Sequence, residues 1–338
     1  MAAVVVEPYA HWQRDTMMQK VRAGVVGVGQ MGQYHVGVYS ELFNVDLIGV
    51  ADCNQDRVTA IAEKYNTTPC TDYHALLDAV DVVSIAVPTS LHYSIARDFL
   101  NAGVHVLLEK PMTHTLEEAS ELFRLAETQG VVLHIGHVER FNGAVQELKK
   151  IVHEPWLIES RRLGPFVPRI KEDGVILDVM IHDIDIILNL VRSPVRCMYA
   201  LGKSIYTTRE DLANVQICFQ NGCIANIIAS RATEVKIRTM AITQRDAYIV
   251  LDYTDQDIRV HRQASSEHLV TRGTLRYKQG SLIERIFVHK ENPLKLEIKH
   301  FIDCAMQEAI RAVSVEEELR SLQVALQVLE MLDKDGLV

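Results

Sequence analysis

The 338-residue sequence has no long apolar segment: no apolar run reaches the ~18 residues that a membrane-spanning helix needs. It also lacks an excess of positive charge, because the formal net charge is -9. This excludes the basic face that nucleic-acid binding requires. The first 15 residues contain no basic segment followed by an apolar stretch, so they do not resemble a signal peptide. We expect residues 1–18 to form an N-terminal extension, with Met17 or Met18 as an alternative start.

Clustered cysteines are missing as well. The six cysteines are scattered, and they form neither a CxxC pair nor a Cys/His group with the spacing of a metal site. We therefore expect reduced thiols, a cytoplasmic location and no bound metal. A hydrophobic content of 48% and a charged content of 23% are typical of globular proteins, and this length accommodates two domains.

What the sequence does contain, from Val21 on, is a regular alternation of strands and helices. Apolar segments with strand character alternate with helical segments up to Ile135, and this order is typical of a parallel, doubly wound sheet. We expect strands at 21–26, 45–52, 82–87, 104–108 and 131–135, and helices after Gly32 and at 57–65, 94–102 and 116–128. Residues 19–136 are therefore predicted to be a Rossmann α/β domain that binds a dinucleotide.

The dinucleotide prediction depends on Gly27-x-Gly29-x-x-Gly32, which lies between the first strand and the first helix. In that context the glycines permit a tight turn, a close approach to a pyrophosphate and close helix–strand packing. An acidic residue, Asp52, follows about 20 residues later, where it can accept hydrogen bonds from a ribose and repel a 2′-phosphate. We predict NAD as the cofactor, although Asn54 and Arg57 leave room for NADP. The predicted cofactor contacts in this turn are Gly27, Gly29, Gln30, Met31 and Gly32.

Two further loops follow predicted strands, and ligands of open α/β sheets bind beyond the carboxyl ends of strands. In the loop at 87–90, Thr89 or Ser90 either caps the next helix or contacts the cofactor. In the loop at 109–111, Lys110 is either a surface lysine or a side chain that binds a substrate hydroxyl.

The segment 174–191, GVILDVMIHDIDIILNLV, predicts an apolar helix that carries several polar residues. At about 100° per residue, Asp178, His182, Asp185 and Asn189 lie on one face, while Asp183 points away. The polar face is expected to meet a polar site, although a hydrogen-bonded interior network would also explain it.

The second half, residues 137–338, is predicted to be an α+β domain for substrate binding and self-association. Alternating apolar and polar residues flank Asn221-Gly222, which is a strong hairpin signal, and indicate an open, mostly antiparallel sheet. We expect this sheet to form the interface of a dimer or tetramer. Two helices close the chain, one after Pro293 and one from Ser314, where Ser314-x-x-Glu317 fits a capping box. An arrangement in which these last helices pack on the first domain is compatible with this prediction.

Four motifs together resemble the Gfo/Idh/MocA oxidoreductase family: GVVGVGQMGQYH, VPTSLH, Glu109-Lys110-Pro111 and LDVMIHDIDI. This resemblance implies that Lys110 and His182 lie at the reacting carbon, with Asp178 beside them. It also implies that Glu109 contacts the nicotinamide ribose and that Pro111 follows a cis peptide bond. Pro88, Thr89 and His92 would lie near the nicotinamide half of the cofactor.

Within the family, GHVERFNGAV and RLGPFVPR look like the bacterial enzymes that oxidise the 3-hydroxyl of UDP-N-acetylglucosamine. Gly143 stands where those enzymes would have proline. The likeness implies a UDP-sugar substrate and a downstream aminotransferase that makes a 2,3-diamino sugar for lipid A. Because a diphosphate favours arginine, Arg140, Arg162 and Arg169 are predicted substrate contacts, with a surface role as the alternative. Asn142 is predicted to contact the sugar, and Phe141 either packs on a uracil or sugar face or lies in the core. Lys110, Asp178 and His182 complete the predicted substrate contacts.

The predicted reaction is the oxidation of a secondary alcohol, in which a base takes the hydroxyl proton. His182 is our hypothesis for the base and Lys110 for its electrostatic partner, with the reverse assignment left open. UDP-N-acetylglucosaminuronate and myo-inositol are alternative substrates. A non-catalytic NAD sensor is an alternative from another class, although such a protein would not need Lys110, Asp178 and His182 together.

Overall fold

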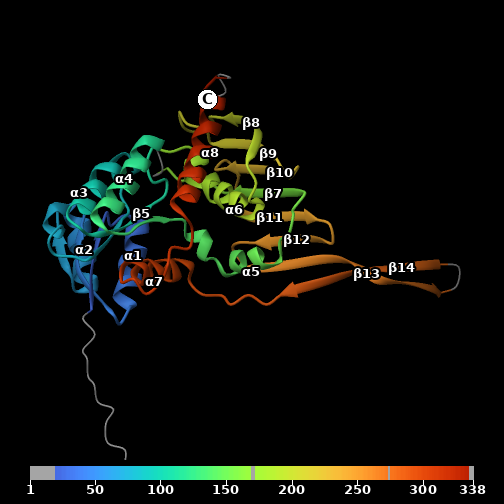
Figure 1. Cartoon of the computed structure of the whole chain (residues 1–338), viewed down its shortest axis with the longest axis horizontal. Coiled ribbons are helices and arrows are strands. Elements are labelled where there is room, and N and C mark those ends of the chain that lie inside the picture. The colour runs from blue at the N-terminus through green and yellow to red at the C-terminus, as the bar shows by residue number, and fades with distance from the viewer. Residues whose placement is uncertain (1–19, 169–171, 273–274, 335–338) are drawn as a thin grey trace, which may run out of the picture.

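The computed structural model describes residues 20–168, 172–272 and 275–334. Two sheets lie side by side, each with helices packed on it (Figure 1). The first is a six-stranded sheet of order β3-β2-β1-β4-β5-β6, in which every neighbouring pair is parallel. The predicted doubly wound α/β fold of the first half is therefore confirmed.

The elements of the first half match the predicted order, apart from one short strand. β3 contains Pro69 and only three residues, too few for a recognisable pattern. The strands are β1 (Val21–Val26), β2 (Val45–Ala51), β3 (Thr68–Cys70), β4 (Val82–Ile85), β5 (His105–Glu109) and β6 (Leu133–Gly136). The helices are α1 (Gln30–Glu41), α2 (Gln55–Tyr65), α3 (His92–Asn101) and α4 (Leu116–Gln129), with short 3-10 turns η1 (Tyr73–Leu76), η2 (Thr89–Leu91) and η3 (Val138–Phe141).

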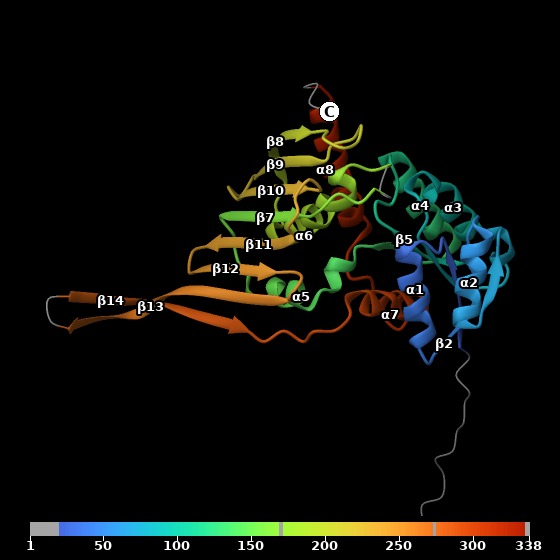
Figure 2. The ribbon, with the colours of Figure 1, turned by 180° about the vertical axis from the view of Figure 1, so that it is seen from behind.

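The second half contains an eight-stranded sheet of order β14-β13-β12-β11-β7-β10-β9-β8, which Figure 2 shows from behind. Its neighbours are antiparallel, as predicted, except for the parallel pair β7–β10 at the centre. The strands are β7 (Leu157–Leu163), β8 (Val195–Lys203), β9 (Leu212–Phe219), β10 (Ile224–Ser230), β11 (Ile237–Gln244), β12 (Ala247–Asp252), β13 (Asp257–Arg272) and β14 (Leu275–Ile286).

The predicted hairpin at Asn221-Gly222 joins β9 to β10. Gly222 has a φ of +90°, which a residue with a side chain rarely adopts. The hairpin of β13 and β14 extends away from the body of the molecule (Figure 1). Only its base was predicted, because the alternating pattern that we recognised ends at Arg262.

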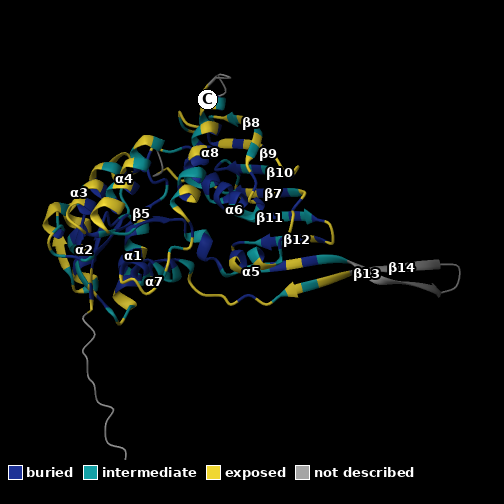
Figure 3. Cartoon of the chain, viewed as in Figure 1, coloured by how far each residue is buried: buried dark blue, intermediate teal, exposed yellow. Residues whose placement is uncertain are grey.

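The described part of the second half contains four α-helices, of which α7 and α8 also pack on helices of the first half. They are α5 (Gly143–Ile151), α6 (Ile181–Val191), α7 (Pro293–Ala305) and α8 (Val315–Lys334). α7 packs on α1 and buries Ile298 and Phe301 in the core of the first sheet. α8 contacts α6, β8 and α4, and of these helices α6 is largely buried while α4 and α8 each have an exposed side (Figure 3). The predicted capping box is confirmed, because Ser314 N donates to Glu317 Oε2 and Glu317 N donates to Ser314 Oγ.

The outer face of the second sheet exposes apolar side chains, among them Tyr199 and Leu201 on β8. Self-association through this face stays a prediction. Among the described residues, no helix is both long and apolar enough to cross a membrane.

Candidate active site

The turn between β1 and α1 leaves room for a ligand beside its backbone. Gly27 has a φ of +85°, and a Cβ on Gly32 would lie 1.7 Å from the carbonyl oxygen of Gly27. A Cβ on Gly29, in contrast, would meet no atom within 4 Å. α1 begins at Gln30 without a side-chain cap, so the first N–H groups of the helix, including those of Gln30 and Met31, have no intrahelical partner. This open cradle fits a dinucleotide pyrophosphate.

Asp52 follows β2 and lies beside this turn. Its carboxylate accepts from Val28 N and Asn54 N, both at 2.9 Å, and is bound bidentately by the Arg57 guanidinium at 2.7 and 3.1 Å. Burial opposes the charge, but Arg57 and the backbone donors lower the pKa of Asp52 overall. The carboxylate is therefore ionised, as the predicted ribose contact requires.

The loop after β4 is joined to a segment of the second half. Thr89 Oγ1 donates to Asp173 Oδ2 at 2.7 Å, and Ser90 Oγ donates to Glu172 Oε2 at 3.2 Å. His114 Nε2 lies 2.9 Å from Asp173 Oδ1. The capping alternative for Thr89 and Ser90 is therefore wrong: neither side chain caps α3. Asp173 and Glu172 were missed because only the fold brings them to this loop.

His92 links this loop to the next one. Its ring nitrogens lie 2.9 Å from the Pro111 oxygen and 3.0 Å from the Val87 oxygen, and the residue is 1% exposed. Burial lowers the pKa of His92, so the ring is neutral and donates to one of the two carbonyls. The structure gives His92 a different role from the predicted contact with the nicotinamide half. Its ring lies between the backbone carbonyls of Val87 and Pro111 and holds the two loops together. Pro88 lies in the same loop, next to η2.

Lys110 crosses from the first sheet to the second half. It follows β5, and the Lys110–Pro111 peptide bond is cis, as predicted. Its Nζ donates to Asp178 Oδ1 at 3.0 Å and to the Asp178 carbonyl oxygen at 2.6 Å. The alternative of a free surface lysine is therefore wrong, since the side chain is only 16% exposed and is held in place.

Glu109 ends a buried chain of hydrogen-bonding side chains. Tyr39 Oη and Ser84 Oγ lie 2.9 Å apart, Ser84 Oγ lies 2.9 Å from His35 Nδ1, and His35 Nε2 lies 3.0 Å from Glu109 Oε1. Burial raises the pKa of Glu109, but the bond to His35 and the charge of Lys110 lower it overall. The other oxygen of Glu109 makes no hydrogen bond to the described residues.

The predicted polar helix is not a uniform α-helix. Residues Ile176–Met180 (η4) form one π turn, and α6 begins after it. π turns are frequent at functional sites, and this one carries Asp178. His182 lies in the first turn of α6, where its Nδ1 is buried and has no hydrogen-bond partner among the described residues. Burial, followed by the charges of Lys110 and Arg162, lowers the pKa of His182 well below 6.5, so the imidazole is neutral.

The structure thus brings together Lys110, Asp178 and His182, as predicted, but not the rest of the polar face. Asp185 accepts from Arg140 Nε at 2.7 Å and from Ser321 Oγ at 2.7 Å, and Asn189 donates to the Asp185 carbonyl oxygen. The alternative of an interior network is correct for these two residues.

The prediction that Arg140 binds substrate is corrected by the structure. Its guanidinium makes four hydrogen bonds to the carboxylates of Asp185 and Glu318, and the residue is 3% exposed. Arg162 is corrected for the same reason: it is also 3% exposed and is held by Asp183 and Glu139.

Two neighbouring predictions are corrected as well. Asn142 is 3% exposed, and its amide donates to the Tyr253 carbonyl oxygen while its oxygen caps α5 at Ala144 N. Phe141 is 8% exposed and packs near His134 and His300 in the interior. Arg169 lies outside the described residues.

We expect Arg140→Met to lower the free energy of unfolding by about 3–5 kcal/mol, because it leaves two carboxylates buried without their partner. Urea denaturation followed by circular dichroism measures this loss. The matched control is Arg161→Met on the exposed side of β7, which is expected to change stability by less than about 0.5 kcal/mol. A loss below about 1 kcal/mol for Arg140→Met would contradict the structural role.

Arg238 on β11 was not predicted, although its signal was present. The alternation of residues 236–243, KIRTMAIT, places Arg238 in phase with Met240 and Ile242, which are both fully buried. A charged residue on the buried face of a strand requires an explanation.

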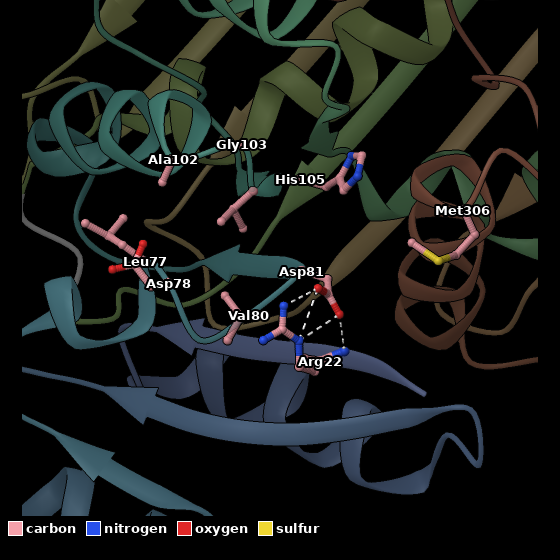
Figure 4. A pocket seen from close by; sticks show the side chains of 10 residues that line it. Arg22, Leu77, Asp78, Val80, Asp81, Ala102, Gly103, His105 and Met306 are labelled. Carbon is pink, nitrogen blue, oxygen red and sulfur yellow. Dashed lines mark hydrogen bonds and ion pairs between the residues drawn. The ribbon is translucent and has the colours of Figure 1, made fainter. Parts of the chain in front are cut away.

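A separate hollow of about 380 Å³ lies at the opposite edge of the first sheet. Figure 4 shows Arg22 and Asp81 paired within it, with His105 nearby. These residues lie at or next to the amino ends of β1, β4 and β5. The hollow is therefore distinct from the crevice that holds Lys110 and His182.

Comparison with known proteins adds independent findings. The model of the oxidoreductase family Gfo/Idh/MocA, with an NAD-binding Rossmann fold, matches residues 21–137, and the model of the family's C-terminal domain matches residues 141–250. The UDP-N-acetylglucosamine 3-dehydrogenase of Acidithiobacillus ferrooxidans is 34% identical over 287 residues, covering 85% of this chain and 89% of that protein. Its solved structure superposes with a TM-score of 0.83 at 32% identity, covering 92% of this chain and 97% of that chain.

Two further proteins have lower sequence identity to this chain. The myo-inositol 2-dehydrogenase of Thermotoga maritima is 26% identical over 230 residues, covering 62% of this chain and 69% of that protein. The structure of a levoglucosan dehydrogenase in complex with NADH has a TM-score of 0.78 at 18% identity and covers 94% of this chain and 98% of that chain, which shows a shared fold.

Proposed function

Because the chain belongs to the Gfo/Idh/MocA family of NAD-dependent oxidoreductases, we propose that it oxidises the 3-hydroxyl of UDP-N-acetylglucosamine. The observation that carries the proposal is the Lys110–Asp178 pair beside a neutral His182 at the carboxyl edge of the first sheet. The choice of substrate is supported by the relative that is 34% identical over most of both chains. We also propose that residues 19–136 form the nucleotide-binding domain and residues 137–338 the substrate domain.

The residues in the first half fit the cofactor. The open turn of Gly27, Gly29 and Gly32 would hold the pyrophosphate, and the ionised Asp52 would accept from the adenosine ribose. The free oxygen of Glu109 would accept from the nicotinamide ribose. When bound, NAD supplies the acceptor for a hydride.

The proton chemistry is assigned to two side chains. In the proposed step the neutral imidazole of His182 takes the proton from the sugar hydroxyl while the hydride leaves the same carbon, so that a ketone forms. Lys110 donates a hydrogen bond to that oxygen and stabilises the negative charge that develops on it. Asp178 positions Lys110 through the 3.0 Å contact. The product is the 3-keto nucleotide sugar, which a transaminase can convert to a 2,3-diamino sugar.

The test combines the protein with NAD, UDP-N-acetylglucosamine, an aminotransferase and its amino donor. We expect NADH to form and a 3-amino nucleotide sugar to be detected by mass spectrometry. Parallel reactions contain UDP-N-acetylglucosaminuronate or myo-inositol. If only one of those two compounds is oxidised, the assignment of the fold and the family is kept, but UDP-N-acetylglucosamine is not the substrate.

We expect Asp52→Asn to raise the KM for NAD about 10- to 100-fold, because hydrogen bonds to a charged acceptor are lost. The KM for NADP is expected to rise less or to fall, since the charge that repels a 2′-phosphate is removed. Initial rates with both cofactors measure the two constants. Asp56→Asn, an exposed neighbour on α2, is the control and should leave both unchanged. An unchanged KM for NAD in Asp52→Asn would contradict the ribose contact.

A further inference from the structure

A guanidinium without a hydrogen-bonded partner among the described residues lies on the inner face of the second sheet. Arg238 on β11 is directly opposite Arg162 on β7 in the antiparallel register. Side chains of directly opposed residues lie on the same face of a sheet. Arg162 reaches Asp183 of α6 at 2.8 Å, so this face is the one that α6 covers. Arg238 therefore extends toward α6.

The two arginines differ in their partners. Arg162 makes hydrogen bonds to Asp183 and Glu139 and lies 4.6 Å from the ring centre of Tyr253. Arg238 makes no hydrogen bond or ion pair with any described residue, although it is half-buried. A half-buried cation beside a second cation is unfavourable unless an anion approaches it. The carboxylates that act on Arg238 make their hydrogen bonds elsewhere: Asp183 and Glu139 bind Arg162, and Asp178 binds Lys110.

Electrostatics agrees with this geometry. Burial and then the positive charge of Arg162 lower the pKa of Arg238 overall, although the charges of Glu139, Asp183 and Asp178 act to raise it. The pKa of Arg162, which makes hydrogen bonds to its carboxylates, is instead raised. The charge of Arg238 is also among the causes that lower the pKa of His182. Arg238 and His182 therefore belong to the same electrostatic environment, next to the part of α6 that the second sheet covers.

We propose that Arg238 binds an oxyanion of the substrate beside His182, with the sugar-linked diphosphate as the occupant. This inference rests on the proposed function, which supplies a nucleotide diphosphate sugar. Arginine suits the role because its planar fork makes paired hydrogen bonds to phosphate or carboxylate oxygens. A uronic acid carboxylate has the same oxyanion chemistry, so the test must separate the two sources. Arg238 is in addition a specificity residue: it favours anionic sugars over neutral polyols such as inositol.

The experiment measures binding, so it does not depend on turnover. Calorimetry with UDP and, separately, with glucuronate is carried out on the full chain and on Arg238→Gln. We expect the Kd for UDP to rise about 10- to 100-fold in Arg238→Gln, because a charge-assisted pair is lost. Arg238→Lys should retain part of the affinity, and NAD binding should be unchanged in both variants.

The control variant is Arg161→Gln on the opposite face of β7, which should bind UDP as the unmodified chain does. A loss of affinity confined to glucuronate would overturn the diphosphate as the occupant and assign the site to a carboxylate. The inference would be overturned if Arg238→Gln bound both probes as tightly as the unmodified chain does. It would also be overturned if the unmodified chain bound neither probe. Arg238-dependent binding of UDP without oxidation of UDP-N-acetylglucosamine would instead overturn only the proposed function.

Discussion

Replacing Lys110 with methionine is expected to lower kcat with the sugar substrate about 10²- to 10³-fold, which is the usual cost of removing one donor to a developing oxyanion. The side chain is held between two parts of the chain by Asp178, with its Nζ 2.6 Å from the carbonyl oxygen and 3.0 Å from the carboxylate. Methionine keeps the length and the apolar stem but removes the charge and all three N–H donors.

Several readouts separate this catalytic role from a structural one. NAD affinity, measured by fluorescence titration, should be unchanged, and the thermal midpoint shows whether the variant is folded. Lys150→Met provides the control, because Lys150 is exposed and pairs only with Glu147 of the same helix. Asp178→Asn should give a smaller loss than Lys110→Met, since it loosens Lys110 but leaves its charge. An unchanged kcat in a folded Lys110→Met variant would show that Lys110 has no catalytic role.

Replacing His182 with asparagine is expected to lower kcat/KM about 10²- to 10⁴-fold, the range typical of a lost general base. Burial and the positive charges of Lys110 and Arg162 lower the pKa of His182 well below 6.5. A base functions in its neutral form, so activity is retained above the pKa of the folded enzyme and lost as the pH falls through it. We therefore expect kcat/KM of the unmodified enzyme to remain level down to pH values below 6.5.

The two predictions are coupled, and the coupling identifies the base. If His182 is the base, the acidic limb of the pH profile disappears in His182→Asn. In Lys110→Met the acidic limb of the residual activity should remain but move to higher pH, because a charge that lowers the pKa of His182 is gone. An acidic limb that persists in His182→Asn but is absent from Lys110→Met would reverse the two roles. His289→Asn, at an exposed site, is the control.

Much of the fold followed from local patterns. The strand–turn–helix order around Gly27 and Gly32 and the hairpin at Asn221-Gly222 were predicted because neighbouring residues in the sequence determine them. The capping box at Ser314 is equally local. The π turn at Asp178 was missed, because helical periodicity assumes the same rotation for every residue.

The arginines show where local reasoning failed. Arg140, Arg162 and Arg238 all have the chemistry that a diphosphate favours, and we assigned substrate contacts to the first two. Arg140 is instead bound by Glu318, 178 residues away in the sequence, and by Asp185. The side chain of Arg238, which was not predicted, makes no hydrogen bond to a carboxylate of the described residues, although three carboxylates act on its charge. Which arginine remains available depends on long-range pairing, and composition carries no information on that pairing.

The sequence by itself determined the Rossmann fold and the preference for NAD, because each depends on residue types at short, regular spacings. Its motifs indicated the trio of Lys110, Asp178 and His182 through their resemblance to a known family. Only the tertiary structure decided which charges neutralise one another. Burying an unpaired charge is costly, so the folded chain pairs Arg140 and Arg162 internally. It leaves the Arg238 side chain without a hydrogen bond to the described residues, and it keeps the imidazole of His182 neutral through burial and then through the charges of Lys110 and Arg162.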